Sequence, residues 1–176
     1  MSNIRKGTIN DVSQIAEIYE RIHEEEEKGI ITTGWMRGIY PTKQTALDAL
    51  KEDDLFVMVQ DEKVIAAARI NQTQMPAYKD VSWEYPNAPE NQVMVLHVLV
   101  VDPNVKGRGY GTQFVEFYEH YALEHNCPYL RIDTNEKNLV ARKLYSRLGY
   151  KESGIIPCIF NGIPDVHLVC LEKTLK

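Results

Sequence analysis

The chain has 176 residues, of which 44% are hydrophobic, and this length and composition are typical of one globular domain with a sizeable core. Its 20 lysines and arginines are outnumbered by 25 aspartates and glutamates, which leaves a net charge of −5. The acidic balance argues against a general nucleic-acid binder, and the longest apolar runs are too short to cross a membrane.

The N-terminus and the cysteines bear on the compartment of the protein. The segment 1–6 has no apolar core of the kind found in signal peptides. The three cysteines, Cys127, Cys158 and Cys170, lack C-x-x-C spacing, which indicates reduced thiols rather than a disulfide framework or a zinc site. We therefore expect a cytoplasmic protein, and the scattered histidines predict no metal site.

Hydrophobic periodicity predicts the secondary structure, with a period of two for strands and of 3.6 for helices. In chain order, we expect a strand over Ile4–Thr8, a helix with its stripe over Ile15–Ile22, a helix beginning at Pro41-Thr42, a hairpin of Leu55–Gln60 and Val64–Asn71, a long loop over Gln72–Gln92, a strand over Val93–Val101, a helix with its stripe over Phe114–Tyr121, a strand over Tyr129–Asp133, a helix over Ala141–Leu148, and strands over Tyr150–Ser153 and Asp165–Thr174. This order predicts a mixed α/β sheet with helices on both faces.

The most informative segment runs from Val95 to Thr112, V-L-H-V-L-V-V-D-P-N-V-K-G-R-G-Y-G-T. A β-branched strand leads into a glycine-rich turn at the start of a helix, where free N–H groups and the helix dipole favour a phosphate. The spacing rules out a Walker loop and departs from the G-x-G-x-x-G dinucleotide fingerprint. Asp133 does lie near the acidic position of that fingerprint. A nucleotide-binding Rossmann domain therefore stays open, as a weaker alternative.

The run from Lys106 to Gly111 resembles the [QR]-x-x-G-x-[GA] loop of the GNAT superfamily of acyl-CoA N-acyltransferases, with Lys106 where the family usually has Gln or Arg. Further on, the segment from Asn138 to Tyr150 is similar to the family's N-x-x-A-x-x-L-Y-x-x-x-G-F ending. The resemblance is sharpest over 93–154. It implies one GNAT-like domain over 1–176, with a mixed, mostly antiparallel central sheet that splays open between its fourth and fifth strands.

This resemblance implies transfer of an acetyl group from acetyl-CoA to the primary amine of a small molecule, by direct attack in a ternary complex without a metal. The pantetheine arm would pair with the backbone of three residues of the splayed strand, Leu99, Val100 and Val101. The glycine turn would hold the pyrophosphate on its amides and flanking charges, through Lys106, Gly107, Arg108, Gly109, Tyr110, Gly111 and Thr112.

The attacking amine must lose a proton, because an alkylammonium group has a pKa near 10.4. His97 is the candidate base, since arylalkylamine N-acetyltransferases of the same superfamily look similar in carrying a histidine at about this place. Strict strand alternation puts His97 on the same face as Val95 and Leu99. A histidine satisfied in the core is an equally good interpretation, and Asp133 or a water molecule are the alternative bases.

Tyr145 matches the general acid of the family, and its phenol, with a pKa near 10, stays protonated at neutral pH. On position alone it would be a core tyrosine, but its register with Asn138 favours the catalytic role. Asn138 is expected to cap a helix and, by resemblance, to contact the CoA arm.

Recognition of the acceptor would fall to the variable segments. The candidates are 34–41, the loop with Trp83 and Tyr85, and Cys158–Pro164, and the acidic run Glu24–Glu27 could attract a cation. We expect a small-molecule amine as partner, with no nucleic acid and no membrane, and leave a homodimer open. A peptide or protein N-acetyltransferase and a non-catalytic acyl-CoA-binding module are the alternative functions.

Overall fold

The computed structural model describes residues 3–175 and contains one seven-stranded sheet with the strand order β1-β2-β3-β4-β5-β7-β6. The strands are β1 (Asn3–Lys6), β2 (Leu55–Gln60), β3 (Lys63–Asn71), β4 (Val93–Val101), β5 (Tyr129–Asn135), β6 (Lys151–Phe160) and β7 (Ile163–Thr174). The α-helices are α1 (Val12–Glu27), α2 (Lys43–Lys51), α3 (Tyr110–Glu124) and α4 (Leu139–Arg147). The predicted order of strands and helices is confirmed.

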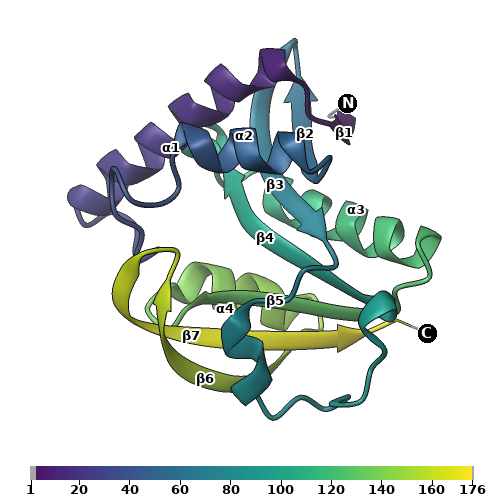
Figure 1. Cartoon of the computed structure of the whole chain (residues 1–176). Helices are drawn as coiled ribbons and strands as arrows, with labels where there is room; N and C mark the ends of the chain where they lie inside the picture. The colour runs from purple at the N-terminus through teal and green to yellow at the C-terminus, as the bar shows by residue number, and fades with distance from the viewer. Residues whose placement is uncertain (1–2, 176) are drawn as a thin grey trace.

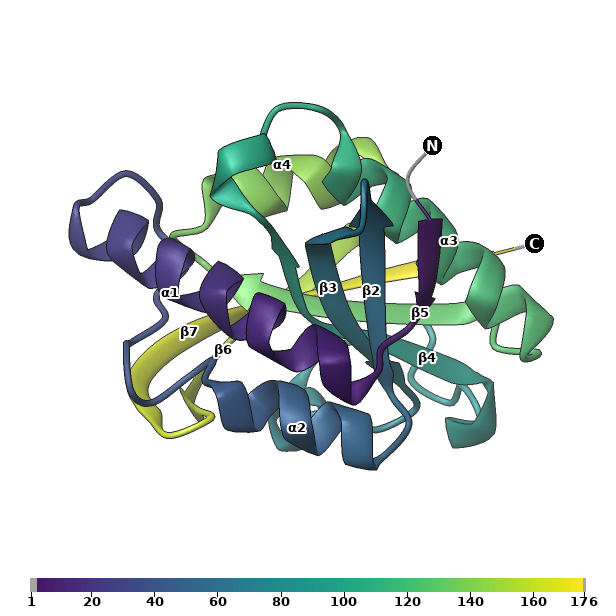
Figure 2. The ribbon, with the colours of Figure 1, turned by 90° about the horizontal axis from the view of Figure 1, so that it is seen from above.

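The helices cover both faces of the sheet, with α1 and α2 on one face and α3 and α4 on the other (Figure 2). The helical stripe of Ile15, Ile18 and Ile22 on α1 packs in one apolar cluster with residues of β2 and β3. The stripe of α3, which includes Phe114 and Tyr118, packs in a second cluster on the other face. Two apolar faces on one sheet require two covering layers, so the sequence pattern dictates this sandwich.

Strands β4 and β5 are the parallel pair of the sheet, and they stay together for only a short distance. Val93 to Leu96 pair with Tyr129 to Ile132, and beyond this point the two strands diverge. Figure 1 shows the resulting V-shaped separation between β4 and β5. The predicted splay between the fourth and fifth strands is therefore confirmed, and it leaves one edge of β4 without a strand partner from 97 onward.

A β-bulge interrupts β4 at this point. The register between β3 and β4 shifts between Ala67 and Arg69, and Val98 has a positive φ of 47°. A bulge places two residues opposite one, so it reverses which face the following side chains occupy. His97 pairs with Arg69 and shares its face with Val95, whereas Leu99 packs on the α3 face. The prediction that His97 and Leu99 share a face was therefore wrong.

The last two strands are longer than predicted. β6 spans Lys151–Phe160 and β7 spans Ile163–Thr174, so the hairpin includes most of the stretch 154–164 that lies between the two expected strands. β6 lies at the edge of the sheet, where a proline such as Pro157 is tolerated because one side of the strand needs no donors. The loop 72–92 contains two short 3-10 helices, η2 (Pro76–Asp80) and η3 (Glu90–Gln92), and it buries Tyr78 and Trp83.

Over residues 3–175, no helix is both long and apolar enough to cross a lipid bilayer.

Candidate active site

A cavity of about 330 Å3 lies where β4 and β5 separate. On the α3 face its walls include Leu99, Val101 and Leu144, which belong to the apolar cluster beneath α3 and α4. On the opposite face they include Trp35 and Val166, which belong to a different cluster beside η2 and β7. One continuous cavity thus passes through the sheet at the point where strand pairing stops.

The glycine turn lies at the α3 end of this cavity. Gly107 and Gly109 have φ values of 81° and 78°, a left-handed conformation that favours glycine, and a Cβ added at either position would meet nothing within 4 Å. α3 begins at Tyr110, immediately after Gly109. The first N–H groups of a helix have no intrahelical acceptor, so those at the start of α3 are suited to bind an anion.

Two cationic side chains flank the turn, and one is paired with a carboxylate while the other is exposed. The Lys106 Nζ atom lies 3.1 Å from a Glu25 carboxylate oxygen, while Arg108 is exposed beside it. At the first turn of α3, the Thr112 hydroxyl accepts a hydrogen bond of 3.0 Å from Arg147. Lys106 and Gly111 line the cavity directly. The turn therefore combines backbone donors with positive side chains, as a pyrophosphate requires.

The free edge of β4 presents backbone groups to the cavity. The Asp102 N–H donates to the Ile65 carbonyl on β3, at 2.8 Å. Backbone groups alternate in direction along a strand, so those of Val101 and Leu99 point away from β3 and into the separation. Val100 also lines the cavity, although its side chain packs on the α1 face. An extended amide chain could pair with this edge as an added strand would.

Asn138 and Tyr145 meet at the same cavity from α4. The Asn138 Oδ1 atom accepts from the Ala141 N–H at 3.2 Å, which confirms the predicted N-cap. Tyr145 is 6% exposed, and its ring packs edge-on against Tyr150 with 5.9 Å between centroids. Burial, together with the negative charge of Asp133, raises the pKa of Tyr145 above its ordinary value. The phenol therefore stays protonated, within electrostatic reach of a carboxylate.

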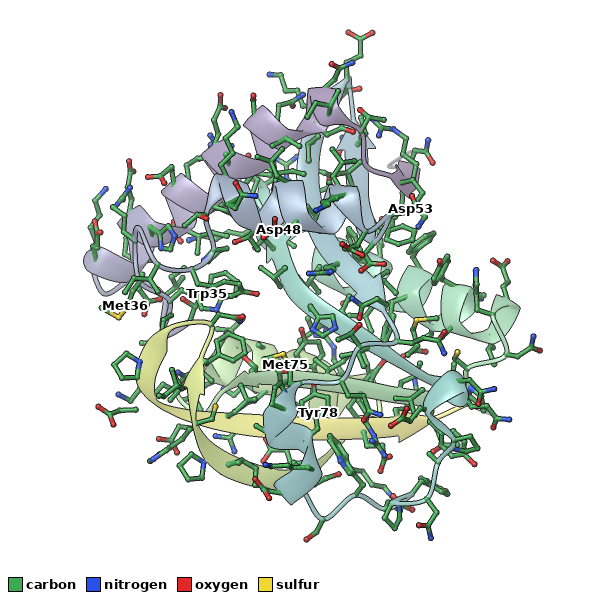
Figure 3. All side chains as sticks on the ribbon, viewed as in Figure 1. Trp35, Met36, Asp48, Asp53, Met75 and Tyr78 are labelled. Carbon is green, nitrogen blue, oxygen red and sulfur yellow. The ribbon has the colours of Figure 1, made fainter. Side chains whose placement is uncertain are left out.

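Asp133 lines the cavity from the end of β5, on the face opposite α3. Its Oδ2 atom accepts a hydrogen bond of 2.7 Å from the Tyr78 hydroxyl, on η2. Figure 3 shows Tyr78 on this short helix, in front of β7. Burial raises the pKa of Asp133 to about 6, although the hydrogen bond from Tyr78 opposes the shift.

The placement of His97 favours the second of the two interpretations, a histidine satisfied in the core. It is not among the residues that line the cavity within 3–175, and its Nε2 atom lies 2.8 Å from Asn71 Oδ1. The Asn71 amide nitrogen donates to Asp54, so its oxygen is the acceptor and His97 is the donor. Burial and the positive charge of Arg69 lower the pKa of His97 to about 4. These contacts describe a neutral histidine that is hydrogen-bonded in a polar network with Asn71 and Asp54.

The acidic run Glu24–Glu27 is largely occupied within the chain. Glu25 pairs with Lys106, and Glu27 pairs with Arg37 at 2.8 Å. The Glu26 carboxylate accepts from the Thr33 N–H and hydroxyl and from the Gly34 N–H. The run therefore fixes neighbouring segments, and in particular the connection between α1 and α2 that forms a wall of the cavity.

The predicted acceptor segments contribute unequally. Trp35 and Tyr40 line the cavity from the connection after α1, and Phe160 lines it from the end of β6. Figure 3 shows Trp35 above the turn of the β6–β7 hairpin. Trp83 is buried against Tyr78, and neither it nor Tyr85 belongs to the walls described for this cavity. Sequence reasoning singled out Trp35 and Phe160 only as parts of longer segments.

Seven of the residues expected from the sequence are brought together around the cavity. They are Leu99, Val100, Val101, Lys106, Gly111, Asn138 and Tyr145. The remaining members of the glycine turn, Gly107, Arg108, Gly109, Tyr110 and Thr112, continue from Lys106 into the start of α3. The turn and the cavity are thus contiguous along the chain.

Comparison with known proteins agrees with this arrangement. A structure from Streptococcus agalactiae described as an acetyltransferase of the GNAT family superposes with a TM-score of 0.82, at 22% identity over 99% of this chain and 96% of that one. A Salmonella typhimurium protein solved with its cofactor acetyl-CoA gives 0.71, at 14% identity over 99% and 94% of the two chains. The ribosomal-protein-S18-alanine N-acetyltransferase of Escherichia coli gives 0.68, at 16% identity over 100% and 95%.

Two uncharacterized N-acetyltransferases of Methanocaldococcus jannaschii are related in sequence. One is 29% identical over 43% of this chain and 49% of its own length, and the other is 24% identical over 87% of this chain and 62% of its own length. The alignments thus span about half to three-fifths of these relatives.

The open sheet with a glycine turn ahead of α3 defines the class of protein by its fold, which is that of the GNAT structures. The sequence model of the Acetyltransferase (GNAT) family matches residues 13–150, and the chain belongs to this family.

Proposed function

We propose that the protein transfers the acetyl group of acetyl-CoA to a primary amine of a small molecule while both are bound in the cavity between β4 and β5. The observation that carries this proposal is the continuity of the cavity through the sheet. Its α3 side has the glycine turn, and its other side has Asp133 and the aromatic residues. Two substrates that enter from opposite faces would meet at the separation, which brings them into reacting geometry.

The α3 side of the cavity fits the coenzyme. The amides after Gly107 and the charge of Arg108 would hold the pyrophosphate. The backbone edge at Leu99 and Val101 matches the two amides of the pantetheine arm. A backbone N–H on this edge would also stabilise the negative charge that develops on the thioester oxygen.

Asp133 is the base that the geometry favours. With a pKa of about 6 it is mostly ionised at neutral pH, so it attracts the cationic amine. The amine gives its first proton to solvent and attacks as the free base, and Asp133 can then accept the second proton. As the amine nitrogen forms its bond to the acetyl carbon, the nitrogen becomes positively charged and its proton strongly acidic. A carboxylate of this pKa is then a sufficient acceptor, and the hydrogen bond from Tyr78 fixes its orientation.

Tyr145 would supply the proton for the leaving sulfur. The carbon–sulfur bond breaks as the nitrogen–carbon bond forms, and the sulfur leaves with the electron pair. Burial raises the pKa of a leaving thiol as it raises that of Tyr145, so the proton transfer is less unfavourable than it would be to a thiolate in water. His97 would act through position, as a neutral donor that holds Asn71 beside the bulge.

The test is release of free coenzyme A thiol with acetyl-CoA and a panel of amines, followed as a function of pH. For wild type, kcat/KM should rise with pH through about 6, because Asp133 must lose its proton to act. Asp133→Asn should lose this acidic limb and reduce kcat/KM by about a hundredfold or more.

His97→Gln is the discriminating comparison, because it removes the alternative base while Asp133 remains. We expect it to keep the limb near pH 6. An acidic limb that survives in Asp133→Asn and disappears in His97→Gln would return the role of base to His97. Absence of thiol release with every amine, together with absence of acetyl-CoA binding by calorimetry, would refute the proposed function itself.

A further inference from the structure

The half of the cavity on the α1 face has a distinctive composition. We give the name acceptor half to the part of this face that lies beside η2 and β7, which contains Trp35, Tyr40, Asp133, Phe160, Val166 and Leu168. Five of the six are apolar or aromatic, and these five pack in the cluster beside η2 and β7. The sixth, Asp133, is held by Tyr78 of the same cluster.

The aromatic rings of the acceptor half form a connected wall. Trp35 meets Tyr40 edge to face, with 6.0 Å between ring centroids, and Tyr40 meets Phe160 in the same way at 5.4 Å. Each ring is thereby fixed by its neighbour, and the faces and edges that remain free favour contact with another ring or a branched apolar group. Such a wall fits an apolar body better than a polar one.

The charges around the acceptor half are unbalanced. Besides Asp133, the acidic and basic side chains that line the cavity are Glu25 and Lys106, which pair with each other at the glycine turn. Arg131 lies on β5 and Arg69 lies on β3, the strand next to β4, but both are engaged elsewhere. Arg69 pairs with Asp54 at 3.1 Å and Arg131 pairs with Glu172 at 3.3 Å, and neither lines the cavity. Within 3–175, the acceptor half thus offers one carboxylate and no unpaired cation.

We propose that the acceptor is a primary amine on an aromatic or branched apolar body that carries no carboxylate. This inference rests on the proposed function and deepens it by naming the substrate class. The ammonium group would be drawn to Asp133, and the apolar body would lie against Trp35, Tyr40 and Phe160. The one charge on the protein is matched by one charge on the substrate.

The same features reject other amines. The α-carboxylate of an amino acid would lie close to Asp133 without a cation to pair with, and a buried unpaired charge is costly. The second ammonium group of a linear diamine would meet an apolar wall. A peptide would need an open path, but the backbone of Gly34 lies in close contact with the side chain of Asn135, which joins the α1–α2 connection to the end of β5.

The experiment compares matched acceptors, each at about 1 mM with saturating acetyl-CoA, by release of free thiol. Phenethylamine and phenylalanine share a skeleton and differ in the carboxylate, and isoamylamine and leucine form a second such pair. We expect kcat/KM for each amine to exceed that for its amino acid by about a hundredfold or more, because the carboxylate is left unpaired. A linear diamine and a short peptide with a free N-terminus should also be poor acceptors.

Two variants of β6 test the aromatic wall. Phe160→Ala should raise the KM for phenethylamine about tenfold, because apolar contact is lost. The KM for acetyl-CoA and the KM for ethylamine should stay unchanged, which a general disruption of the fold would not permit. Ile159→Ala is the matched control, since Ile159 is the preceding residue on the same strand and is 76% exposed.

The outcomes separate the two proposals. Faster acetylation of phenylalanine, of the diamine or of the peptide than of phenethylamine would overturn the inference and leave the proposed function standing. Binding of acetyl-CoA by calorimetry without acetylation of either apolar amine would overturn the inference as well. Failure to bind acetyl-CoA would refute the proposed function and the inference together.

Discussion

At the residue scale, the main result is that Tyr145 and Asp133 share one cavity from opposite faces of the sheet. Tyr145 reaches it from α4, and Asp133 reaches it from the end of β5. The two groups interact electrostatically, because the charge on Asp133 contributes to the raised pKa of Tyr145. A carboxylate that ionises near neutrality can accept a proton, and a phenol that stays protonated can donate one.

Replacement of the phenol tests its role. Tyr145→Phe should lower kcat by about a hundredfold and leave the affinity for acetyl-CoA nearly unchanged, because it removes one proton donor and keeps the ring. Steady-state kinetics and calorimetry measure the two effects. Tyr150→Phe is the matched control, since Tyr150 packs against Tyr145 but does not belong to the cavity walls within the described residues. Equal turnover in wild type and Tyr145→Phe would exclude the tyrosine from proton transfer.

At the element scale, β4 and the start of α3 position the residues of the candidate active site. β4 loses its partner β5 after Leu96, and the bulge at Val98 reverses the faces of the residues that follow. The strand then delivers the chain to the glycine turn and the first amides of α3. The connection after α1 closes the other side, where Glu26 holds it through Thr33 and Gly34.

A substitution in the glycine turn tests coenzyme binding. Gly109→Val should weaken the affinity for acetyl-CoA by about a hundredfold or more, because its side chain would occupy the open space in which a phosphate would approach the amides. Gly29→Val is the control, since Gly29 also has a positive φ, of 70°, and open space around an added Cβ, but lies at the end of α1. Both variants carry the same backbone strain. If calorimetry gave the same loss for both, strain rather than phosphate contact would explain it.

At the scale of the whole molecule, the buried carboxylate should reduce stability. Because the folded-state pKa of Asp133, about 6, lies above the value near 3.9 expected in the unfolded chain, folding favours the protonated form. The stabilising effect of that form is present below about pH 4 and is lost as the pH rises through about 6. Proteins are often less stable than they could be because a functional site needs a particular charge.

Asp133→Asn should therefore melt at a higher temperature than wild type at about pH 8, with a difference that shrinks towards about pH 4. Asparagine keeps an oxygen that can accept the hydrogen bond from Tyr78. Thermal unfolding at several pH values measures the effect, and Asp80→Asn, at an exposed aspartate, controls for the loss of one charge. A difference in melting temperature that is the same at every pH would show that ionisation of Asp133 does not oppose folding.

Much of the architecture could be predicted because it is encoded locally. The bounds of β2 and β4 follow from mostly apolar runs of strand length, and the glycine turn is readable from its spacing. The later hairpin could not be predicted so well, because Gly154 and Pro157 weaken the strand pattern of β6, and pairing with β7 overrides that local preference. The face of His97 was also missed, because a bulge leaves no mark in a β-branched run.

The sequence by itself determined the order of elements, the two apolar faces of the sheet and the glycine turn before α3, since each depends on neighbouring residues and on their periodicity. Only the tertiary structure decided which ionisable groups meet. Asp133 and Tyr78 are 55 positions apart, and their hydrogen bond exists because η2 folds back over β5 and β7. The burial that moves the pKa of Asp133 towards neutrality comes from elements distant in the chain, so no local pattern could have shown it.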